Sequence, residues 1–200
     1  MSHEVRTKFG DREIIIETGK MAKQAGGSVT IRCGDTIVLV AATAAASAKE
    51  GIDFLPLTVE YLEKTFSAGK IPGGFFKREG RPTDQAVLVS RFIDRPIRPL
   101  FPEHYYFDTQ VIAMVISAEP NNIPDVLALT AASTALMISD IPFTGPIAGI
   151  RVGCVDGKLV LNPSYKERAT SDFDIVVAGT TNKINMIEAG AKIISEKDIV

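Results

Sequence analysis

The stretch Ser28–Ala44, SVTIRCGDTIVLVAATA, decides the fold class, because it predicts two neighbouring strands of one sheet. Both halves are rich in β-branched residues, which favour an extended backbone. Gly34 and Asp35 lie between the halves and form a short turn signal. We therefore expect an antiparallel hairpin here. On its N-terminal side, the run Glu13–Glu17, EIIIE, predicts a further strand.

Further strands and one helix are predicted towards the C-terminus. Leu55–Leu62 has the pattern of a strand, and Asp108–Ser117 is a nearly continuous apolar run. Such a run is typical of an interior strand covered on both faces. Val126–Ile138 carries small and apolar residues at helical spacing after a possible cap at Asn122, which predicts a buried helix. The dipeptide Asp156-Gly157 is the strongest short-range hairpin signal in the chain.

The last third of the chain completes the fold prediction. Phe173–Gly179 and Ile184–Ala189 have the pattern of another strand pair, and Ser195 with Asp198 resembles the start of a final helix. A helix that stopped at Val200 would have under two turns, so we expect the chain to be a piece of something longer. The predicted fold is an α/β domain with a mixed sheet and few helices.

Composition sets broad limits on function. The 200 residues are 46% hydrophobic and 23% charged, which suits one large globular domain with a sizeable core. The N-terminus lacks the features of a targeting peptide and no run approaches the ~20 apolar residues of a membrane span, so we expect a cytoplasmic protein without a membrane partner. Cys33 and Cys154 lie far apart, and we expect core thiols rather than a disulfide or a zinc site.

Cations, aromatic residues and turn residues gather in the stretch Gly73–Phe101, GGFFKREGRPTDQAVLVSRFIDRPIRPLF. Its formal charge is +3, whereas the whole chain carries −2. A local cationic island on a mildly acidic protein indicates an anionic partner.

The first part of this stretch predicts an exposed loop over Ile71–Arg81, because glycines and prolines interrupt any apolar period. Phe75 and Phe76 on such a loop could stack on unpaired bases, with Lys77 and Arg78 at the phosphates between them. Alternatively, the two phenylalanines are buried at a subunit interface and the cations form a solvated rim. The pattern alone leaves both interpretations open.

The second part predicts a helix that Thr83 caps. Arg91, Arg95 and Arg98 then fall at i, i+4 and i+7, on one helical face, where their planar guanidinium groups suit phosphate. Pro96 disfavours helix at the residue before it, so we expect a break at Arg95. The alternative role for one or two of these arginines is pairing with the neighbouring carboxylates, Asp84 and Asp94.

No catalytic residue is predicted within these 200 residues. His3 and His104 have no motif around them, so nothing activates Ser133 or Thr134 as a nucleophile, and we expect both hydroxyls to bond back to the helix backbone. The carboxylates that could hold a metal are scattered without ligand spacing, and none is predicted as a metal ligand: Asp53, Glu60, Asp84, Asp94 and Asp108. There is no glycine-rich phosphate loop, which argues against a metabolite kinase.

Two runs carry a family resemblance. GGFFKREGRPTDQAVLVSRFIDRPIRPLFP resembles the signature of the first RNase PH-like core of polynucleotide phosphorylases, and KFGDREIIIETGKMAKQAGGSV is similar to the start of that core. The likeness extends over essentially all 200 residues, and the motif is highly specific. One departure is Lys77, where the family commonly has arginine, so bidentate phosphate binding by that side chain would be lost.

The resemblance implies a fold, a reaction and partners. The fold would be an RNase PH-like core (ribosomal protein S5 domain 2-like), with residues 1–200 forming the first such domain, truncated at its C-terminal helix. The reaction would be reversible 3′-to-5′ phosphorolysis of RNA that releases nucleoside diphosphates, with inorganic phosphate as substrate. Mg²⁺ and the catalytic residues would be held by a second core that, like the C-terminal RNA-binding modules, lies outside this chain. The subunits would form a homotrimeric ring and could work with other RNA-degradation machinery.

Pattern and resemblance together assign this core to the guidance of single-stranded RNA. The alternative is a non-catalytic RNA-binding ring component of an exosome-like assembly. The residues expected to bind RNA are Phe75, Phe76, Lys77, Arg78, Arg81, Arg91, Arg95 and Arg98.

Overall fold

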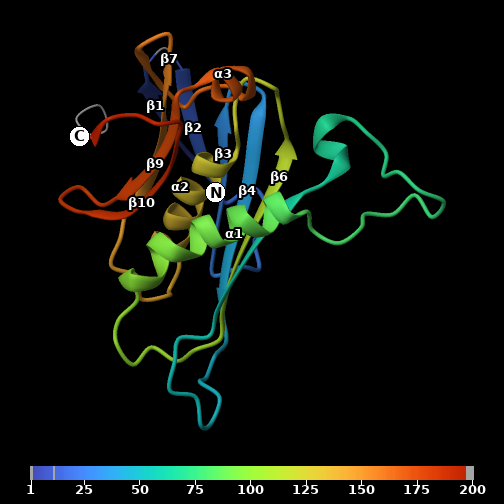
Figure 1. The fold of residues 1–200 in the computed structure, drawn as a ribbon. Helices are drawn as coiled ribbons and strands as arrows, with labels where there is room; N and C mark the ends of the chain where they lie inside the picture. Colours follow the sequence, from blue (N-terminus) through green and yellow to red (C-terminus); the bar gives the residue numbers. More distant parts are fainter. Residues whose placement is uncertain (1, 11, 197–200) are drawn as a thin grey trace.

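The computed structural model describes residues 2–10 and 12–196, which form two β-sheets with helices between and beside them (Figure 1). The first sheet is mixed, as the sequence predicts, since β5 runs parallel to β6 and every other neighbouring pair is antiparallel. In spatial order its six strands are β1 (His3–Phe9), β2 (Arg12–Thr18), β3 (Gly27–Cys33), β4 (Thr36–Ala44), β6 (Thr109–Ser117) and β5 (Leu57–Glu63).

The hairpin predicted for Ser28–Ala44 is confirmed. Strands β3 and β4 pair from Gly27 opposite Ala42 to Cys33 opposite Thr36. Gly34 in the turn has φ 58°, a left-handed conformation that glycine adopts without strain. The side chains of Val29, Ile31, Val38 and Val40 are almost fully buried on one face of this hairpin.

The second sheet is antiparallel throughout, and it confirms both predicted C-terminal strand pairs. Asp156 and Gly157 form its first turn, both with positive φ. A short helix, α3 (Tyr165–Thr170), follows the second strand, and the helix predicted from Ser195 falls largely outside the described residues. In spatial order the strands are β10 (Ile184–Ala191), β9 (Phe173–Gly179), β7 (Ala148–Val155) and β8 (Lys158–Leu161).

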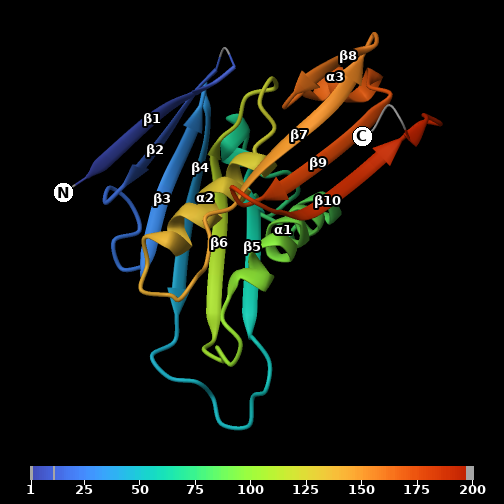
Figure 2. The ribbon, with the colours of Figure 1, turned by 90° about the vertical axis from the view of Figure 1, so that its left-hand side faces the viewer.

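Helix α2 (Asp125–Met137) lies between the two sheets, and Figures 1 and 2 show it enclosed from both sides. It packs on β3 and β4 of the first sheet and on β7 of the second. A helix packed between two sheets needs apolar or small residues on most of its surface, and its alanines and leucines supply them, while Thr130 and Thr134 are half-buried and Met137 is exposed. Thr134 bonds back to the carbonyl of Thr130, as predicted, whereas the Ser133 hydroxyl instead accepts the N–H of Ile147.

Strand β6 differs from its prediction. Alternate residues such as Val111, Ala113 and Val115 are fully buried beneath the helices, but Ile112 and Met114 on the other face are only half-buried. The strand is therefore interior in the sheet yet covered on one face only, and the prediction of cover on both faces is wrong for these residues.

Helix α1 (Asp84–Ile97) packs against β5 and α2, and it continues through Pro96. The predicted break at Arg95 is therefore wrong. Pro96 lies near the end of the helix, where it removes only one backbone hydrogen bond. The helical bond from the N–H of Arg98 to the carbonyl of Asp94 still forms. Burial of Ile93 and Ile97 holds this last turn, which passes into the 3-10 turn η2 (Arg98–Leu100).

A buried charge cluster joins α2 to the second sheet. Arg151 on β7 forms ion pairs with Asp125 at the start of α2 and with both carboxylate oxygens of Asp174 on β9, the latter at 2.6 and 2.7 Å. Arg168 of α3 also pairs with Asp174. The residues lie too far apart in sequence for a pattern to predict the cluster. Removing one member would leave a buried charge without its partner, so the cluster fixes how α2, α3 and this sheet sit together.

Neither a membrane span nor a metal cluster is found in this part of the chain. None of the helices formed by the described residues is both long and apolar enough to cross a membrane. Within residues 2–10 and 12–196, no three His, Cys, Asp or Glu side chains come together in a way that could hold a metal ion. Cys33 is buried, as predicted for a core thiol, while Cys154 is half-buried.

The close approach of α2 to the first sheet gives a testable prediction. A Cβ atom added to Gly27 would lie 2.0 Å from the backbone oxygen of Ala135, and neither backbone can move without disturbing a sheet or a helix. Gly27→Ala should lower the free energy of unfolding by about 3 kcal/mol or more, measured by urea denaturation.

Gly80→Ala is the matched control, because a Cβ atom there meets open space. It should change the free energy of unfolding by no more than about 0.5 kcal/mol. Equal stability of the two variants would show that α2 does not press on β3 as described.

Candidate nucleic-acid interface

The predicted loop projects away from both sheets, between the 3-10 turn η1 (Thr65–Ala68) and helix α1 (Figure 1). Almost all of its side chains are exposed, as the sequence predicts. Phe75 is 93% exposed and Phe76 is 80% exposed. Two aromatic rings held in water are costly unless a partner covers them, so the loop has the character of a binding element.

The two rings contact each other edge to face, with centroids 5.4 Å apart and planes at 85°. This pair is flanked by two left-handed residues, Gly74 with φ 79° and Lys77 with φ 50°. Such angles turn the chain sharply on either side of the phenylalanines. The non-glycine residue among them, Lys77, carries local backbone strain of the kind found at functional sites. Both rings remain largely exposed between these turns.

The base of the loop is closed by Glu79. One oxygen of its carboxylate accepts the backbone N–H of Thr65 at 2.8 Å and the hydroxyl of Thr65 at 2.7 Å. These two hydrogen bonds lower the pKa of Glu79 below its ordinary value, because they favour the ionised form. Ser67 in turn accepts the N–H of Ala118 beyond β6, so the anchored leg of the loop is tied to the first sheet.

The loop cations have no carboxylate partner. Lys77, Arg78 and Arg81 are exposed and form no ion pair with any of the described residues. Their charges are therefore available to an anion that approaches the phenylalanines. The structure thus brings together the five loop residues that the sequence predicts as RNA contacts.

The three arginines of α1 and its end behave differently. Arg98 donates hydrogen bonds to Asp94 and to the backbone oxygens of Leu55 and Leu57, at 2.7 to 3.2 Å. Its guanidinium group is therefore occupied by contacts within the chain. The alternative of carboxylate pairing is the one that the geometry favours for Arg98. Arg91 lies 3.9 Å from Asp94 and Arg95 lies 3.6 Å from Glu188, and both remain largely exposed.

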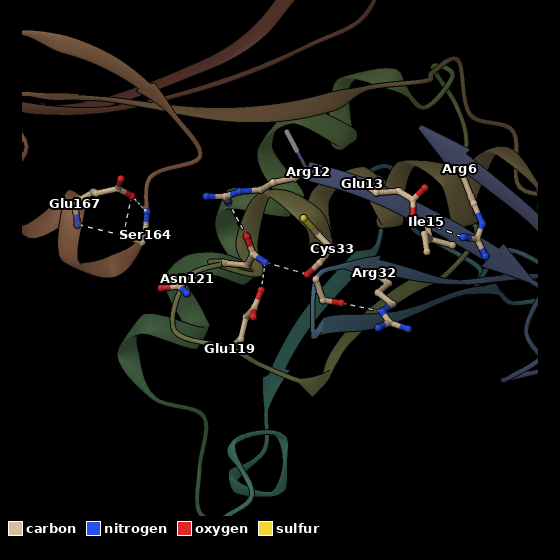
Figure 3. A pocket seen from close by; sticks show the side chains of 12 residues that line it. Arg6, Arg12, Glu13, Ile15, Arg32, Cys33, Glu119, Asn121, Ser164 and Glu167 are labelled. Atoms are coloured by element: carbon tan, nitrogen blue, oxygen red, sulfur yellow. Dashed lines mark hydrogen bonds and ion pairs between the residues drawn. The ribbon is translucent and has the colours of Figure 1, made fainter. Parts of the chain in front are cut away.

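A polar cavity was missed by the sequence reasoning. It has a volume of about 760 Å³ and lies where the ends of β2 and β3 meet the β6–α2 connection and α3 (Figure 3). The charged residues that line the cavity are spread from position 6 to position 167: Arg6, Arg12, Glu13, Arg32, Glu119 and Glu167. The only signal of the cavity in the sequence is the alternation of arginines with apolar residues in β1–β3.

The sequence and fold comparisons define the class of protein. Residues 10–142 match the model of the 3′ exoribonuclease family, domain 1, and residues 145–200 match domain 2 of the same family. The chain therefore belongs to the 3′ exoribonuclease family. The boundary between the two matches falls just before β7, where the chain passes from the first sheet and α2 to the second sheet.

The curated relatives are more specific. The chain is 58% identical over 198 residues to a polyribonucleotide nucleotidyltransferase of Geobacter sulfurreducens, covering 99% of this chain and 28% of the relative. It is 59% identical over 187 residues to the protein of that name from Anaeromyxobacter dehalogenans, covering 94% and 26%. The chain thus spans less than a third of the length of these relatives, and it is homologous to one part of them.

Solved structures confirm the RNase PH-like fold. Rice Rrp46 superimposes with a TM-score of 0.68 at 17% identity, covering all of this chain and 84% of Rrp46. The Archaeoglobus fulgidus exosome with RNA bound to the active site contains a chain that superimposes with a TM-score of 0.71 at 17% identity, covering 94% and 81%. At this identity the likeness shows the fold alone.

The anchor at Glu79 gives a prediction about the loop. In Glu79→Ala the backbone N–H of Thr65 loses its acceptor, so its hydrogen exchange should become at least about tenfold faster. Glu103 is an exposed glutamate elsewhere in the chain, and Glu103→Ala should leave the exchange rate of the Thr65 amide unchanged. Because the pKa of Glu79 is lowered, its anchoring is complete above the ordinary glutamate pKa and is lost only as pH falls through the lower, folded-state value.

The NMR shift of the Thr65 amide followed against pH checks that sign. It should titrate at a pH below the ordinary glutamate pKa in the parent and not at all in Glu79→Ala. A midpoint above the ordinary value would contradict the anchoring geometry.

Proposed function

We propose that this chain is the RNA-guiding core of a phosphorolytic 3′-to-5′ exoribonuclease. The observation that carries the proposal is the exposed Phe75–Phe76 pair with unpaired cations beside it. Base stacking contributes about 1–3 kcal/mol per base without reading sequence, and guanidinium and ammonium groups bind the linking phosphates. The loop therefore suits single-stranded RNA of any sequence.

The family supports the reaction. Relatives named polyribonucleotide nucleotidyltransferase cover the whole chain, and one fold neighbour holds RNA at its active site. We propose that the complete protein transfers the 3′-terminal nucleotide of RNA to inorganic phosphate and releases a nucleoside diphosphate. The P–O bond of the last linkage breaks as phosphate oxygen attacks, and the shortened RNA leaves with a 3′ hydroxyl.

Mg²⁺ would neutralise the charge that develops on the transferred group. The described residues offer no carboxylate cluster for it, so we place its ligands, and the catalytic residues, outside this chain. A homotrimeric ring in the cytoplasm, in contact with RNA-degradation machinery, remains part of the proposal, as does the assignment of residues 1–200 to a first core.

The role of each predicted residue can be stated within this proposal. Phe75 and Phe76 stack on bases, and Lys77, Arg78 and Arg81 hold the phosphates beside them. Arg91 and Arg95 remain open enough to extend the path. Arg98 connects the end of α1 to the backbone of Leu55 and Leu57 and so contributes to RNA binding only indirectly, by holding α1 in place.

A non-catalytic RNA-binding component of an exosome-like ring is the second candidate. The fold match to Rrp46 and to an exosome chain favours it. Phosphate-dependent release of nucleoside diphosphates by the complete protein distinguishes the two, since binding alone needs only the loop.

The loop assignment is tested by binding of a fluorescent single-stranded oligoribonucleotide across a salt series. Phe75→Ala/Phe76→Ala should weaken binding by about 30-fold or more, because each ring contributes at least about 1 kcal/mol, with the salt slope unchanged. Lys77→Ala/Arg78→Ala/Arg81→Ala should instead reduce the slope by about 2, since about 0.7 counterion is released per phosphate contact on a single strand.

Phe54→Ala is the matched control, because Phe54 is also an exposed phenylalanine on a loop but the sequence around it, Gly51–Leu57, contains no lysine or arginine. It should bind RNA as the parent does. If the Phe75/Phe76 variant binds RNA equally well but changes the oligomeric state, the phenylalanines belong to a subunit interface and the loop assignment fails.

A further inference from the structure

We propose that the cavity lined by Arg6, Arg12, Arg32 and Glu167 binds a ribonucleotide, separately from the Phe75–Phe76 loop. Its volume of about 760 Å³ falls in the range of small-molecule sites. Figure 3 shows Arg12 between Glu167 of α3 and its capping residue Ser164 on one side and Arg6, Ile15 and Arg32 on the other.

Arg12 is the fixed cation of this cavity. One of its terminal nitrogens donates to the side-chain oxygen of Asn122 at 2.7 Å and to the backbone oxygen of Asn162 at 3.3 Å. Both acceptors are neutral, and Arg12 forms no ion pair with any residue that the structure describes. Its charge interacts with the Glu167 carboxylate across the cavity, but its three remaining N–H groups have no acceptor among the described residues. They can bind a ligand, and a planar guanidinium suits the oxygens of a phosphate.

The support beneath Arg12 is itself rigid. Asn122 is only 7% exposed, and its amide nitrogen donates to the backbone oxygen of Cys33 at 3.0 Å and to Glu119. Its backbone oxygen accepts the hydroxyl of Thr36, which is fully buried. A cation held by a buried amide loses little side-chain entropy when it binds, so the site is organised before the ligand arrives.

Three cross-strand neighbours form the other side of the cavity. Arg6 lies opposite Ile15, and Ile15 lies opposite Arg32, so the three side chains form a row on one face of β1, β2 and β3. Arg32 donates to the backbone oxygen of Gly34 and lies 3.6 Å from Asp35. Arg6 pairs with Glu4 at 2.7 Å and with Glu13 at 3.6 Å, and both arginine side chains stay more than half exposed. The guanidinium groups are planar, so a base can stack on them and contact the apolar Ile15 side chain between them.

The glutamates of the cavity suit the hydroxyl groups of a ribose. One oxygen of Glu167 accepts the N–H and the hydroxyl of Ser164, which lowers the pKa of Glu167 and leaves its second oxygen as an acceptor. Carboxylates commonly accept hydrogen bonds from ribose hydroxyls in nucleotide sites. Arg12 for phosphate, the row of Arg6, Ile15 and Arg32 for the base and Glu167 for the ribose together fit a ribonucleoside phosphate better than phosphate alone.

That unit can come from a free nucleoside diphosphate or from a nucleotide within an RNA strand. The site uses none of the loop residues, so it stands even where the loop assignment fails. Calorimetric titration of the chain with ADP, 2′-deoxy-ADP and inorganic phosphate should give affinity in that descending order. Arg12→Gln should weaken ADP binding about tenfold or more, and Arg32→Gln about threefold.

Lys158→Gln, an exposed lysine on the second sheet, is the matched control and should bind ADP as the parent does. Thermal melts establish that each variant is folded, and Arg32→Gln serves if loss of Arg12 unfolds the chain. If Arg12→Gln and Arg32→Gln also weaken binding of an oligoribonucleotide, the strand supplies the ligand; if only ADP binding falls, the free diphosphate does. Unchanged affinity of both folded variants for ADP and for the oligoribonucleotide would overturn the proposal.

Discussion

The burial of α2 between two sheets is the constraint on which the rest of the structure depends. Most of this helix is buried, so its sequence is made largely of alanine, leucine and small polar residues, and Gly27 allows β3 to approach its backbone. Arg151 then ties the start of the helix to the second sheet through Asp125 and Asp174. A rigid centre of this kind fixes the positions of the strands and loops that surround it.

The two proposed sites, the Phe75–Phe76 loop and the cavity beside Arg12, lie outside this rigid centre. The loop between η1 and α1 is exposed along its length but anchored at its base by Glu79, so it can present Phe75 and Phe76 without belonging to the core. The cavity beside Arg12 has the opposite construction, because a buried amide holds its central cation. We propose that the loop stacks on the bases of an RNA strand and that the cavity binds a single nucleotide unit.

The sequence predicted the parts whose signals are local. The β-branched hairpin around Gly34, the cap at Thr83 and the exposed loop were all predicted because each depends on neighbours a few residues away. The break at Arg95 was wrong because tertiary burial of Ile93 and Ile97 outweighed one lost hydrogen bond at Pro96. Neither the Arg151 cluster nor the Arg12 cavity could be predicted, since their members come together only through the order of the strands. The likeness to known families supplied the reaction, which local patterns do not encode.

The measurement that tests the central claim most directly is photochemical crosslinking of a 4-thiouridine oligoribonucleotide to the chain, with the crosslinked peptides identified by mass spectrometry. If the loop guides RNA by stacking, crosslinks should concentrate on the peptide that contains Phe75 and Phe76 and should disappear when both are changed to alanine. Crosslinks that lie elsewhere in the parent, and that persist in this variant, would show that RNA follows another surface and that the phenylalanines serve a different purpose.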